Sequence, residues 1–284
     1  MDVNGKAVII TGASTGIGQA TAELMAERGA RLGLVARSED KLWELASRLN
    51  EAWVTAADLS DPITVRSTAD RILDHFDHVD VLINNAGQGY DVAVENTETD
   101  KFSYMFRLHV LAPLLLMQAV IPGMRAEGAG TIVNISSGTT LLTLPNNGPY
   151  TATKLALNGL SLTARKELAR DGIKVCVVYP SLTDTPFEDG TQAFSDPAAL
   201  WKPGPGGPGA GAAGGGAASG GGAAPGGRAA SGGGAAPGGD VPQIPPPDPP
   251  VLVARKVLEA IETGEAEVFA HDRMAQMRGQ TGRP

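Results

Sequence analysis

Three side chains in the middle of the chain have the types and spacing of an acid/base set. Tyr150 and Lys154 stand four residues apart, and Ser137 precedes Tyr150 by thirteen positions. On a helix, residues four apart project from the same face. A positive charge beside a phenol favours the phenolate, so Lys154 is expected to lower the tyrosine pKa from about 10 toward neutrality. Ser137 could then hydrogen-bond the substrate oxygen. A core tyrosine beside an exposed lysine would have the same spacing.

The start of the chain reads as a strand, a glycine-rich turn and a helix. Residues 7–10 are a short apolar run, as in a buried parallel strand, and apolar residues recur at helical spacing over 17–25. Between them, Gly12, Gly16 and Gly18 would let the backbone approach a pyrophosphate at the amino end of the helix, which attracts anions. The spacing is Gly-x-x-x-Gly-x-Gly, which differs from the common dinucleotide fingerprint, and an ordinary strand–helix turn stays open as the alternative.

Strand-like and helical segments alternate along the chain. The pattern predicts strands over 6–11, 31–36, 52–56, 79–84, 130–135 and 173–179, and helices over 17–28, 39–49, 62–76, 98–125 and 149–170. We therefore expect an α/β fold, a doubly wound, mostly parallel, Rossmann-like sheet with helices on both faces. In such folds ligands bind beyond the carboxyl ends of the strands, where the pattern gathers Gly12, Arg37, Asp58, Asn85, Ser137 and Pro180.

A low-complexity segment interrupts this alternation. Residues 203–239 contain only Gly, Ala, Pro and Ser apart from Arg228, and residues 217–227 recur unchanged at 229–239. Such a sequence cannot bury a core. We expect a core domain over 1–202, a disordered insertion over 203–250 in the lid region, and a C-terminal part over 251–284. That last part holds a helix at 251–263, a strand at 267–270 and a polar tail. Whether the insertion is a tolerated expansion or a partner-binding segment is open.

Five motifs occur in a characteristic order. They are Thr11-Gly12-x-x-x-Gly16-Ile17-Gly18, Asn84-Asn85-Ala86-Gly87, Ser137, Tyr150-x-x-x-Lys154 and a turn led by Pro180. In this order the chain resembles the short-chain dehydrogenase/reductase family over residues 4–190 and, more weakly, over 251–270. The resemblance implies a Rossmann-like oxidoreductase that interconverts an alcohol and a carbonyl by hydride transfer with a nicotinamide cofactor. It also implies a small-molecule substrate and a homodimer or homotetramer.

The resemblance assigns catalytic roles residue by residue. Tyr150 would be the general acid or base, Lys154 would lower its pKa and hold the nicotinamide ribose, and Ser137 would orient the substrate oxygen, with Ser136 as the alternative. His109 stands where the family usually has an asparagine that helps hold a water beside the lysine. A role of His109 in that proton relay and a plain packing role both remain open.

The end of the second predicted strand bears on the choice of cofactor. No carboxylate ends that strand, whereas Arg37 and Ser38 could bind a 2′-phosphate, which favours NADP over NAD. Many NADP-binding relatives carry a second basic residue where this chain has Thr15. By resemblance Asp58 would contact the adenine, with a helix N-cap as its alternative. The residues expected to bind the cofactor are Gly12, Ser14, Thr15, Gly16, Ile17, Gly18, Arg37, Ser38, Asp58, Asn85, Ala86, Gly87, Tyr150, Lys154 and Thr185.

Composition bounds the remaining function classes. The net charge is −8 and no basic stripe is present, so we expect neither nucleic acid nor an anionic membrane as a partner. The predicted first strand begins almost at Met1, no apolar run approaches the about 20 residues of a membrane span, and the single Cys176 lies in an apolar run. A cytoplasmic enzyme without disulfides or a metal cluster is therefore expected. The alternative is a cofactor-binding regulatory or scaffold protein with little turnover, suggested by His109 and by Ser181 in place of the family's glycine.

Overall fold

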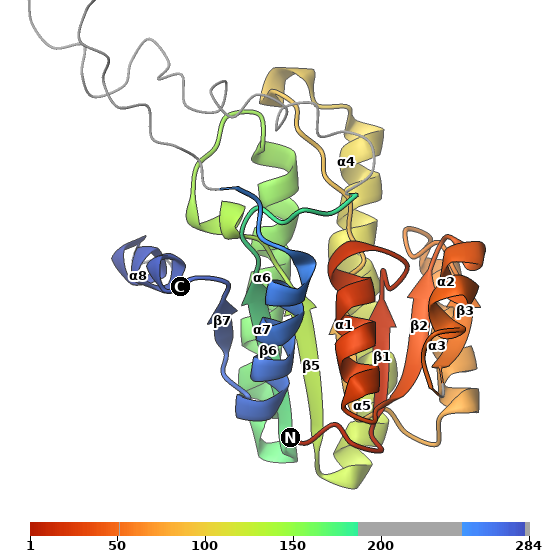
Figure 1. The fold of residues 1–284 in the computed structure, drawn as a ribbon. Helices are drawn as coiled ribbons and strands as arrows, with labels where there is room; N and C mark the ends of the chain where they lie inside the picture. The colour runs from red at the N-terminus through yellow and green to blue at the C-terminus, as the bar shows by residue number, and fades with distance from the viewer. Residues whose placement is uncertain (51, 187–245, 282–284) are drawn as a thin grey trace, which may run out of the picture. The chain divides into compact units, whose positions relative to one another are not determined.

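The computed structural model describes residues 1–50, 52–186 and 246–281. Most of the predicted low-complexity insertion, up to residue 245, thus lies outside the described residues. Within the described part the strands form one parallel sheet in the order β3-β2-β1-β4-β5-β6-β7 (Figure 1). They are β1 (Ala7–Thr11), β2 (Arg31–Ala36), β3 (Ala52–Ala56), β4 (Val81–Asn84), β5 (Gly130–Ile135), β6 (Ile173–Tyr179) and β7 (Glu267–Phe269). The predicted doubly wound α/β class is confirmed.

Helices cover both faces of this sheet. One face carries α1 (Gly16–Glu27), α2 (Glu39–Ala46) and α7 (Pro250–Thr263), and the other carries α3 (Pro62–His75), α5 (Ala112–Glu127) and α6 (Gly148–Leu168). Because both faces are covered, β1, β4 and β5 are buried along their whole length, including the polar Thr131 and Asn134 of β5. The winding direction reverses between β1 and β4, the switch point where ligands bind in such sheets.

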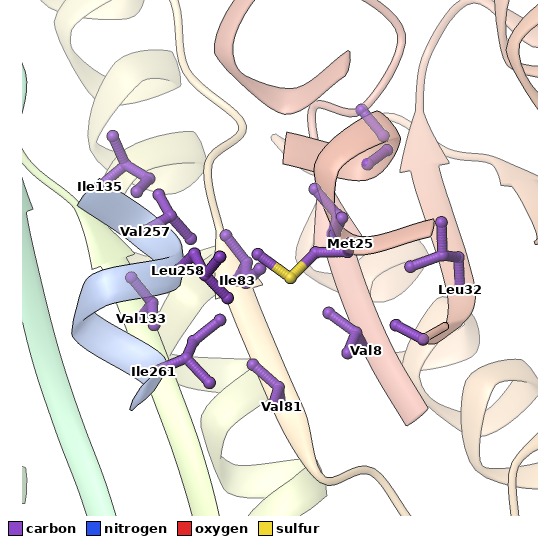
Figure 2. Packing of buried hydrophobic residues seen from close by; sticks show 14 of the residues in the cluster. Val8, Met25, Leu32, Val81, Ile83, Val133, Ile135, Val257, Leu258 and Ile261 are labelled. Carbon is purple, nitrogen blue, oxygen red and sulfur yellow. The ribbon is translucent and has the colours of Figure 1, made fainter. Parts of the chain in front are cut away.

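The larger core lies between α1, α7 and the middle of the sheet. Met25 of α1 and Leu258 of α7 point toward Ile83 of β4 (Figure 2). All three side chains are almost fully buried. Helix α7 therefore completes the core that α1 and the sheet form.

The predicted single helix over 98–125 is three segments in the structure. These are α4 (Thr99–Phe106), a π turn (Arg107–Leu111) and α5. Pro113 has no N–H to donate to the carbonyl of His109 four residues earlier, so the regular helical bond is missing there and a wider turn replaces it. His109 lies inside that turn.

The stretch Thr99–Glu127 is long and apolar enough by composition to span a membrane, a feature that the sequence analysis overlooked. Half of its most apolar window is buried inside the protein. The buried residues of α5 belong to the core on one face of the sheet, with α3 and β5. Packing against the sheet therefore accounts for the apolar character of this stretch.

A further helix, α8 (Asp272–Thr281), forms where the sequence predicted a polar tail. Met274 is buried against Leu141 and Tyr179, and its methyl group lies beside Gly138. One buried methionine in a polar segment gives too sparse a pattern to predict a helix from sequence. As a result, α8 contacts the loop that follows β5.

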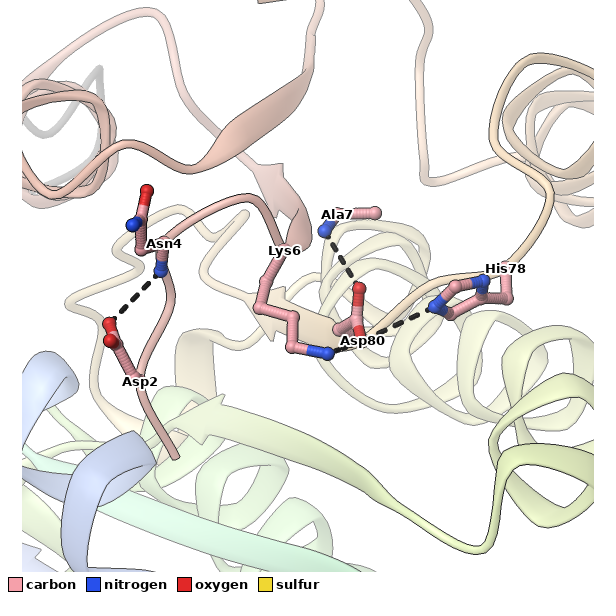
Figure 3. A network of polar contacts seen from close by, with 6 residues as sticks. All are labelled: Asp2, Asn4, Lys6, Ala7, His78 and Asp80. Carbon is pink, nitrogen blue, oxygen red and sulfur yellow. Dashed lines mark hydrogen bonds and ion pairs between the residues drawn. The ribbon is translucent and has the colours of Figure 1, made fainter.

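A cluster of polar side chains joins the amino ends of β1 and β4. The buried carboxylate of Asp80 accepts the backbone N–H of Ala7 at 2.9 Å and the ammonium of Lys6 at 3.0 Å. The imidazole of His78 lies 3.4 Å from the same carboxylate (Figure 3). These contacts sit at the amino ends of the strands and hold the two central strands together, away from the predicted site.

Candidate active site

The glycine-rich turn after β1 is packed too closely for side chains. Gly12 has φ +65°, and a Cβ there would lie 2.8 Å from the Cα of Ala86. A Cβ on Gly18 would overlap the carbonyl oxygen of Gly12. The amide of Asn85 donates to the carbonyls of Thr11 and Gly12 at 3.0 and 3.1 Å. Asn85 therefore joins the end of β4 to the glycine turn.

A pocket that is open to solvent lies over this turn at the carboxyl ends of β1 to β4. Twelve of the residues predicted to bind a cofactor line it: Gly12, Ser14, Thr15, Gly16, Ile17, Arg37, Ser38, Asp58, Asn85, Ala86, Gly87 and Thr185. Gly18, Tyr150 and Lys154 do not line it. The sequence analysis missed Ala36, Ala57, Leu59, Gln88, Leu108 and Pro186. All but Leu108 are next in sequence to a predicted residue, whereas Leu108 enters from the π turn.

The ends of β2 and β3 form the far wall of the pocket. Arg37 donates from Nη1 to the Tyr104 hydroxyl at 3.4 Å. Asp58 accepts the backbone N–H of Ser60 at 2.9 Å, whereas the N-cap of α3 is Asp61. The alternative of Asp58 as the helix cap is therefore wrong, and Asp58 lines the pocket instead.

Ser137 and Tyr150 meet beyond the end of β5. Ser137 is the N-cap of the 3₁₀ helix Gly138–Leu141, and its hydroxyl oxygen accepts from the N–H and the hydroxyl of Thr139 at 3.2 and 3.0 Å. The Ser137 hydroxyl also hydrogen-bonds the phenol of Tyr150. Since its oxygen already accepts twice, Ser137 is arranged to donate to the phenol oxygen. The Oγ of Ser136 is buried and has no hydrogen-bond partner among the described residues.

Lys154 lies one turn further along α6, and its side chain is buried. Its Nζ donates to the carbonyl of Ile135 at 2.9 Å and lies 5.8 Å from the centre of the Tyr150 ring. Burial lowers the pKa of Lys154 to about 8, because a buried ammonium loses its hydration. Tyr150 and Lys154 therefore project from the same side of α6, as their spacing predicted.

The pKa of Tyr150 moves opposite to the sequence-based expectation. Burial of the phenol, with a further contribution from the charge of Asp91, raises this pKa to about 12, although the Ser137 hydrogen bond acts in the other direction. The expectation of a lowered value is wrong for the protein by itself. The sequence shows the charged neighbour, but it does not show that the phenol is desolvated.

His109 is buried against Tyr150, with the two rings edge to face at 5.7 Å. Its Nε2 accepts the backbone N–H of Gln88 at 3.0 Å, and its Nδ1 lies 2.8 Å from the hydroxyl of Thr153. The Thr153 hydroxyl donates to the carbonyl of Tyr150 at 2.7 Å. Burial, with the charge of Lys154, holds the pKa of His109 well below its ordinary value. The imidazole is therefore neutral and bonded on both sides.

The segment after β6 carries Thr185 to the glycine turn. A Cβ on Gly16, which has φ +57°, would lie 2.8 Å from Cγ2 of Thr185. Ser181 donates its hydroxyl to the carboxylate of Asp248, and the Nε2 of His271 lies 2.6 Å from the same carboxylate. Ser181, which departs from the family pattern, thus ties this segment to the C-terminal part of the chain.

Comparison with known proteins agrees with this geometry. Residues 6–195 match the family profile described as short chain dehydrogenase. An uncharacterized oxidoreductase of Staphylococcus epidermidis is 34% identical over 190 residues, which cover 66% of this chain and 83% of that protein.

Two solved structures are similar and contain dinucleotides. A metagenomic short-chain oxidoreductase in complex with NADP is 34% identical, with a TM-score of 0.60 over 63% of this chain and 84% of that chain. The 3-ketoacyl-(acyl-carrier-protein) reductase of Brucella melitensis, complexed with NADH, is 30% identical, with a TM-score of 0.63 over 65% of this chain and 79% of that chain. With the family profile matching most of the chain, the protein belongs to the short-chain dehydrogenase/reductase family of oxidoreductases.

Proposed function

We propose that the protein is an NADP(H)-dependent oxidoreductase that interconverts an alcohol and a carbonyl compound. The observation that carries the proposal is the hydrogen bond from Ser137 to the phenol of Tyr150, one helical turn from the buried ammonium of Lys154. A serine donor, a phenol and an ammonium together can hold a substrate oxygen and exchange a proton with it.

The pocket over the glycine turn fits a dinucleotide. Gly12, Ser14, Thr15 and Gly16 line the pocket at the amino end of α1, where a pyrophosphate would meet backbone N–H groups. Asp58 and Thr185 lie along the same pocket, where they would hold the adenine and the nicotinamide amide. When bound, the nicotinamide ring would supply or accept the hydride.

Tyr150 would supply the proton. Because its pKa is raised to about 12, the phenol is protonated at neutral pH and ready to act as a general acid in carbonyl reduction. Ser137 would hold the substrate oxygen beside the phenol, and Lys154 would stabilise the phenolate left after proton transfer. In alcohol oxidation the phenolate would be the base.

The end of β2 supports NADP as the cofactor. One similar structure holds NADP and another holds NADH, so family membership leaves the choice open. In this chain Arg37 and Ser38 line the pocket just beyond β2, where an acidic residue would be needed to bind the ribose of NAD. A guanidinium at this position pairs with a 2′-phosphate.

A regulatory or scaffold protein on the same fold is the second candidate. It was suggested by His109 and Ser181, and both residues have hydrogen-bond partners that give them structural roles. The complete set of Ser137, Tyr150 and Lys154 favours the enzyme. The test is NADPH oxidation against a panel of ketones, aldehydes and quinones. Turnover supports the enzyme, whereas tight NADPH binding without turnover supports the regulatory protein.

A homo-oligomer is part of the same proposal. Phe106 on α4 and Leu155 on α6 are each more than one-third exposed, and the two helices pack side by side. Exposed apolar side chains on adjacent helices suit a subunit interface. Light scattering of the wild-type protein and of a Phe106→Glu/Leu155→Glu variant tests this. We expect the variant to have the smaller mass, and a monomeric wild type would contradict the proposal.

A further inference from the structure

Asp248 is joined through its backbone to the segment that follows β6. Its N–H donates to the carbonyl of Leu182 at 2.8 Å, and its carbonyl accepts the N–H of Asp184 at 2.9 Å. These two bonds form an isolated parallel bridge between Thr183 and Asp248, outside the seven-stranded sheet. The bridge therefore holds the chain immediately before Thr185, which lines the pocket over the glycine turn.

The side chain of Asp248 holds the same segment a second time. Its Oδ2 accepts the hydroxyl of Ser181 and lies 2.6 Å from the Nε2 of His271. The carboxylate is only 17% exposed, so solvent screens these contacts weakly. Hydrogen bonds to an ionised acceptor are also stronger than those between neutral groups. Asp248 thus binds the segment through both its side chain and its backbone.

The sequence around Asp248 makes it a rigid anchor. Prolines stand at positions 246, 247, 249 and 250, and none of them has a backbone N–H. Within 246–250, Asp248 is therefore the one residue that can donate a backbone hydrogen bond to Leu182. The proline rings also fix the φ angles on either side of it, so little conformational freedom is lost when the bridge forms.

The segment that Asp248 holds connects two parts of the candidate site. At its start, the carbonyl of Pro180 accepts the N–H of Gly138 in the loop after β5 at 2.8 Å. At its end, Thr185 lies so close to the glycine turn that a Cβ on Gly16 would be 2.8 Å from its Cγ2. Thr185 makes no hydrogen bond to another described residue. Its place over the turn therefore depends on the chain that leads to it, which Asp248 fixes.

We propose that Asp248 is a positioning residue of the cofactor site, which sets the place of Thr185 against the dinucleotide. This inference rests on the proposed binding of NADPH and adds a residue that does not touch the cofactor. Asp248 does not line the pocket, so its effect must pass through the segment that ends at Thr185. When only a fraction of the molecules holds a segment in its binding conformation, the apparent affinity for the ligand falls by that fraction.

The test is a double-mutant cycle on the dissociation constant (Kd) of NADPH, measured by fluorescence titration without substrate. A neutral hydrogen bond changes an equilibrium by about 2- to 10-fold, so Thr185→Ala should raise the Kd by about that factor. Asp248→Ala should raise the Kd of the wild type by a similar factor. In the Thr185→Ala background the same change should have an effect of less than about 2-fold, because the contact that Asp248 positions is already absent.

Three further variants make the result specific. Asp248→Asn keeps an oxygen for both Ser181 and His271 but carries no charge, so its NADPH affinity should stay close to that of the wild type. Ser181→Ala removes only the hydroxyl and should reproduce the weaker binding, even if Asp248→Ala is unstable. Asp272→Ala removes an exposed carboxylate next to His271 and should leave the affinity unchanged. Thermal unfolding without cofactor shows which variants are folded.

The possible failures can be told apart. If folded Ser181→Ala binds NADPH as the wild type does, or if the effects of Asp248→Ala and Thr185→Ala add, Asp248 does not act through Thr185. If Asp248→Asn binds as weakly as Asp248→Ala, the charge alone matters. In each of these cases the inference is wrong while the proposed function stands. If the wild type binds neither NADPH nor NADH, the proposed function fails and this inference fails with it.

Discussion

The backbone N–H of Gln88 donates to the Nε2 of His109 over 3.0 Å, and this contact fixes the tautomer of the histidine. A nitrogen that accepts an N–H carries no proton, so the neutral ring has its proton on Nδ1 and donates it to Thr153. His109 therefore links the loop after β4 to α6, the helix of Tyr150 and Lys154. A proton relay through this ring would first have to break one of these two bonds, so the geometry favours a positioning role.

Replacing His109 by phenylalanine separates the two roles. His109→Phe leaves the N–H of Gln88 without its buried acceptor, and we expect the free energy of unfolding to fall by about 1 to 3 kcal/mol. Turnover should fall as well, whereas the shape of the pH–rate profile should stay the same. Chemical denaturation and steady-state rates across pH measure both effects. Unchanged stability with an altered pH profile would support the relay.

Arg37 should set the preference for NADP. Arg37→Asp replaces the guanidinium with a carboxylate that repels a 2′-phosphate and binds a ribose, so the KM for NADPH should rise by about 10- to 100-fold while NADH improves. Because Arg37 also contacts the Tyr104 hydroxyl, Tyr104→Phe is the matched control and should keep the preference. An unchanged ratio of the two cofactors in Arg37→Asp would remove this residue from the site.

Burial of the Lys154 ammonium should lower the free energy of unfolding at neutral pH. The pKa of Lys154 is about 8 in the folded protein, against an ordinary 10.5, so below pH 8 the ammonium is buried at the expense of stability. Between these two values the unfolded chain binds more protons than the folded one, and stability rises with pH. We expect Lys154→Met to gain about 1 to 3 kcal/mol at pH 7, with the gain shrinking as pH rises through this window, and to lose turnover.

The exposed Lys166 on the same helix provides the control for this effect. Lys166→Met removes a charge without relieving burial and should leave the pH dependence as in the wild type. Thermal unfolding between pH 7 and pH 10 compares the three proteins. A loss of stability in Lys154→Met at pH 7 would mean that the bond to Ile135 outweighs the desolvation of the ammonium.

The close packing at Gly18 makes a further prediction. In Gly18→Ala the new methyl group would meet the carbonyl of Gly12, so we expect weaker NADPH binding and a loss of about 1 to 3 kcal/mol of stability. In Gly159→Ala, also in a helix, a Cβ meets nothing within 4 Å, and the same change should stabilise by about 0.5 to 1 kcal/mol. NADPH titration and thermal unfolding measure both. Normal NADPH affinity in Gly18→Ala would contradict the close-packing account.

The sheet and the arrangement of its strand ends could be predicted from the sequence, because both depend on local patterns of residues. The limits of β2 and β5 could be predicted to the residue, because each strand holds apolar residues between flanking turn residues. The π turn could not, since it depends on Pro113 acting within an otherwise regular helix. Helix α8 was missed because its one buried anchor, Met274, has meaning only against the loop it covers.

The chemistry of the site was harder to predict than its residues. The types and spacing of Ser137, Tyr150 and Lys154 predicted that they would lie together, but the direction of the tyrosine pKa depends on burial, which no motif encodes.

The most direct measurement is the turnover of Tyr150→Phe with NADPH and a carbonyl substrate of the wild type. The change removes one oxygen atom, so thermal unfolding and NADPH affinity should stay close to those of the wild type, while kcat should fall by about 10²- to 10⁴-fold. Undiminished reduction by a folded, NADPH-binding Tyr150→Phe would contradict the proposal that this phenol delivers the proton.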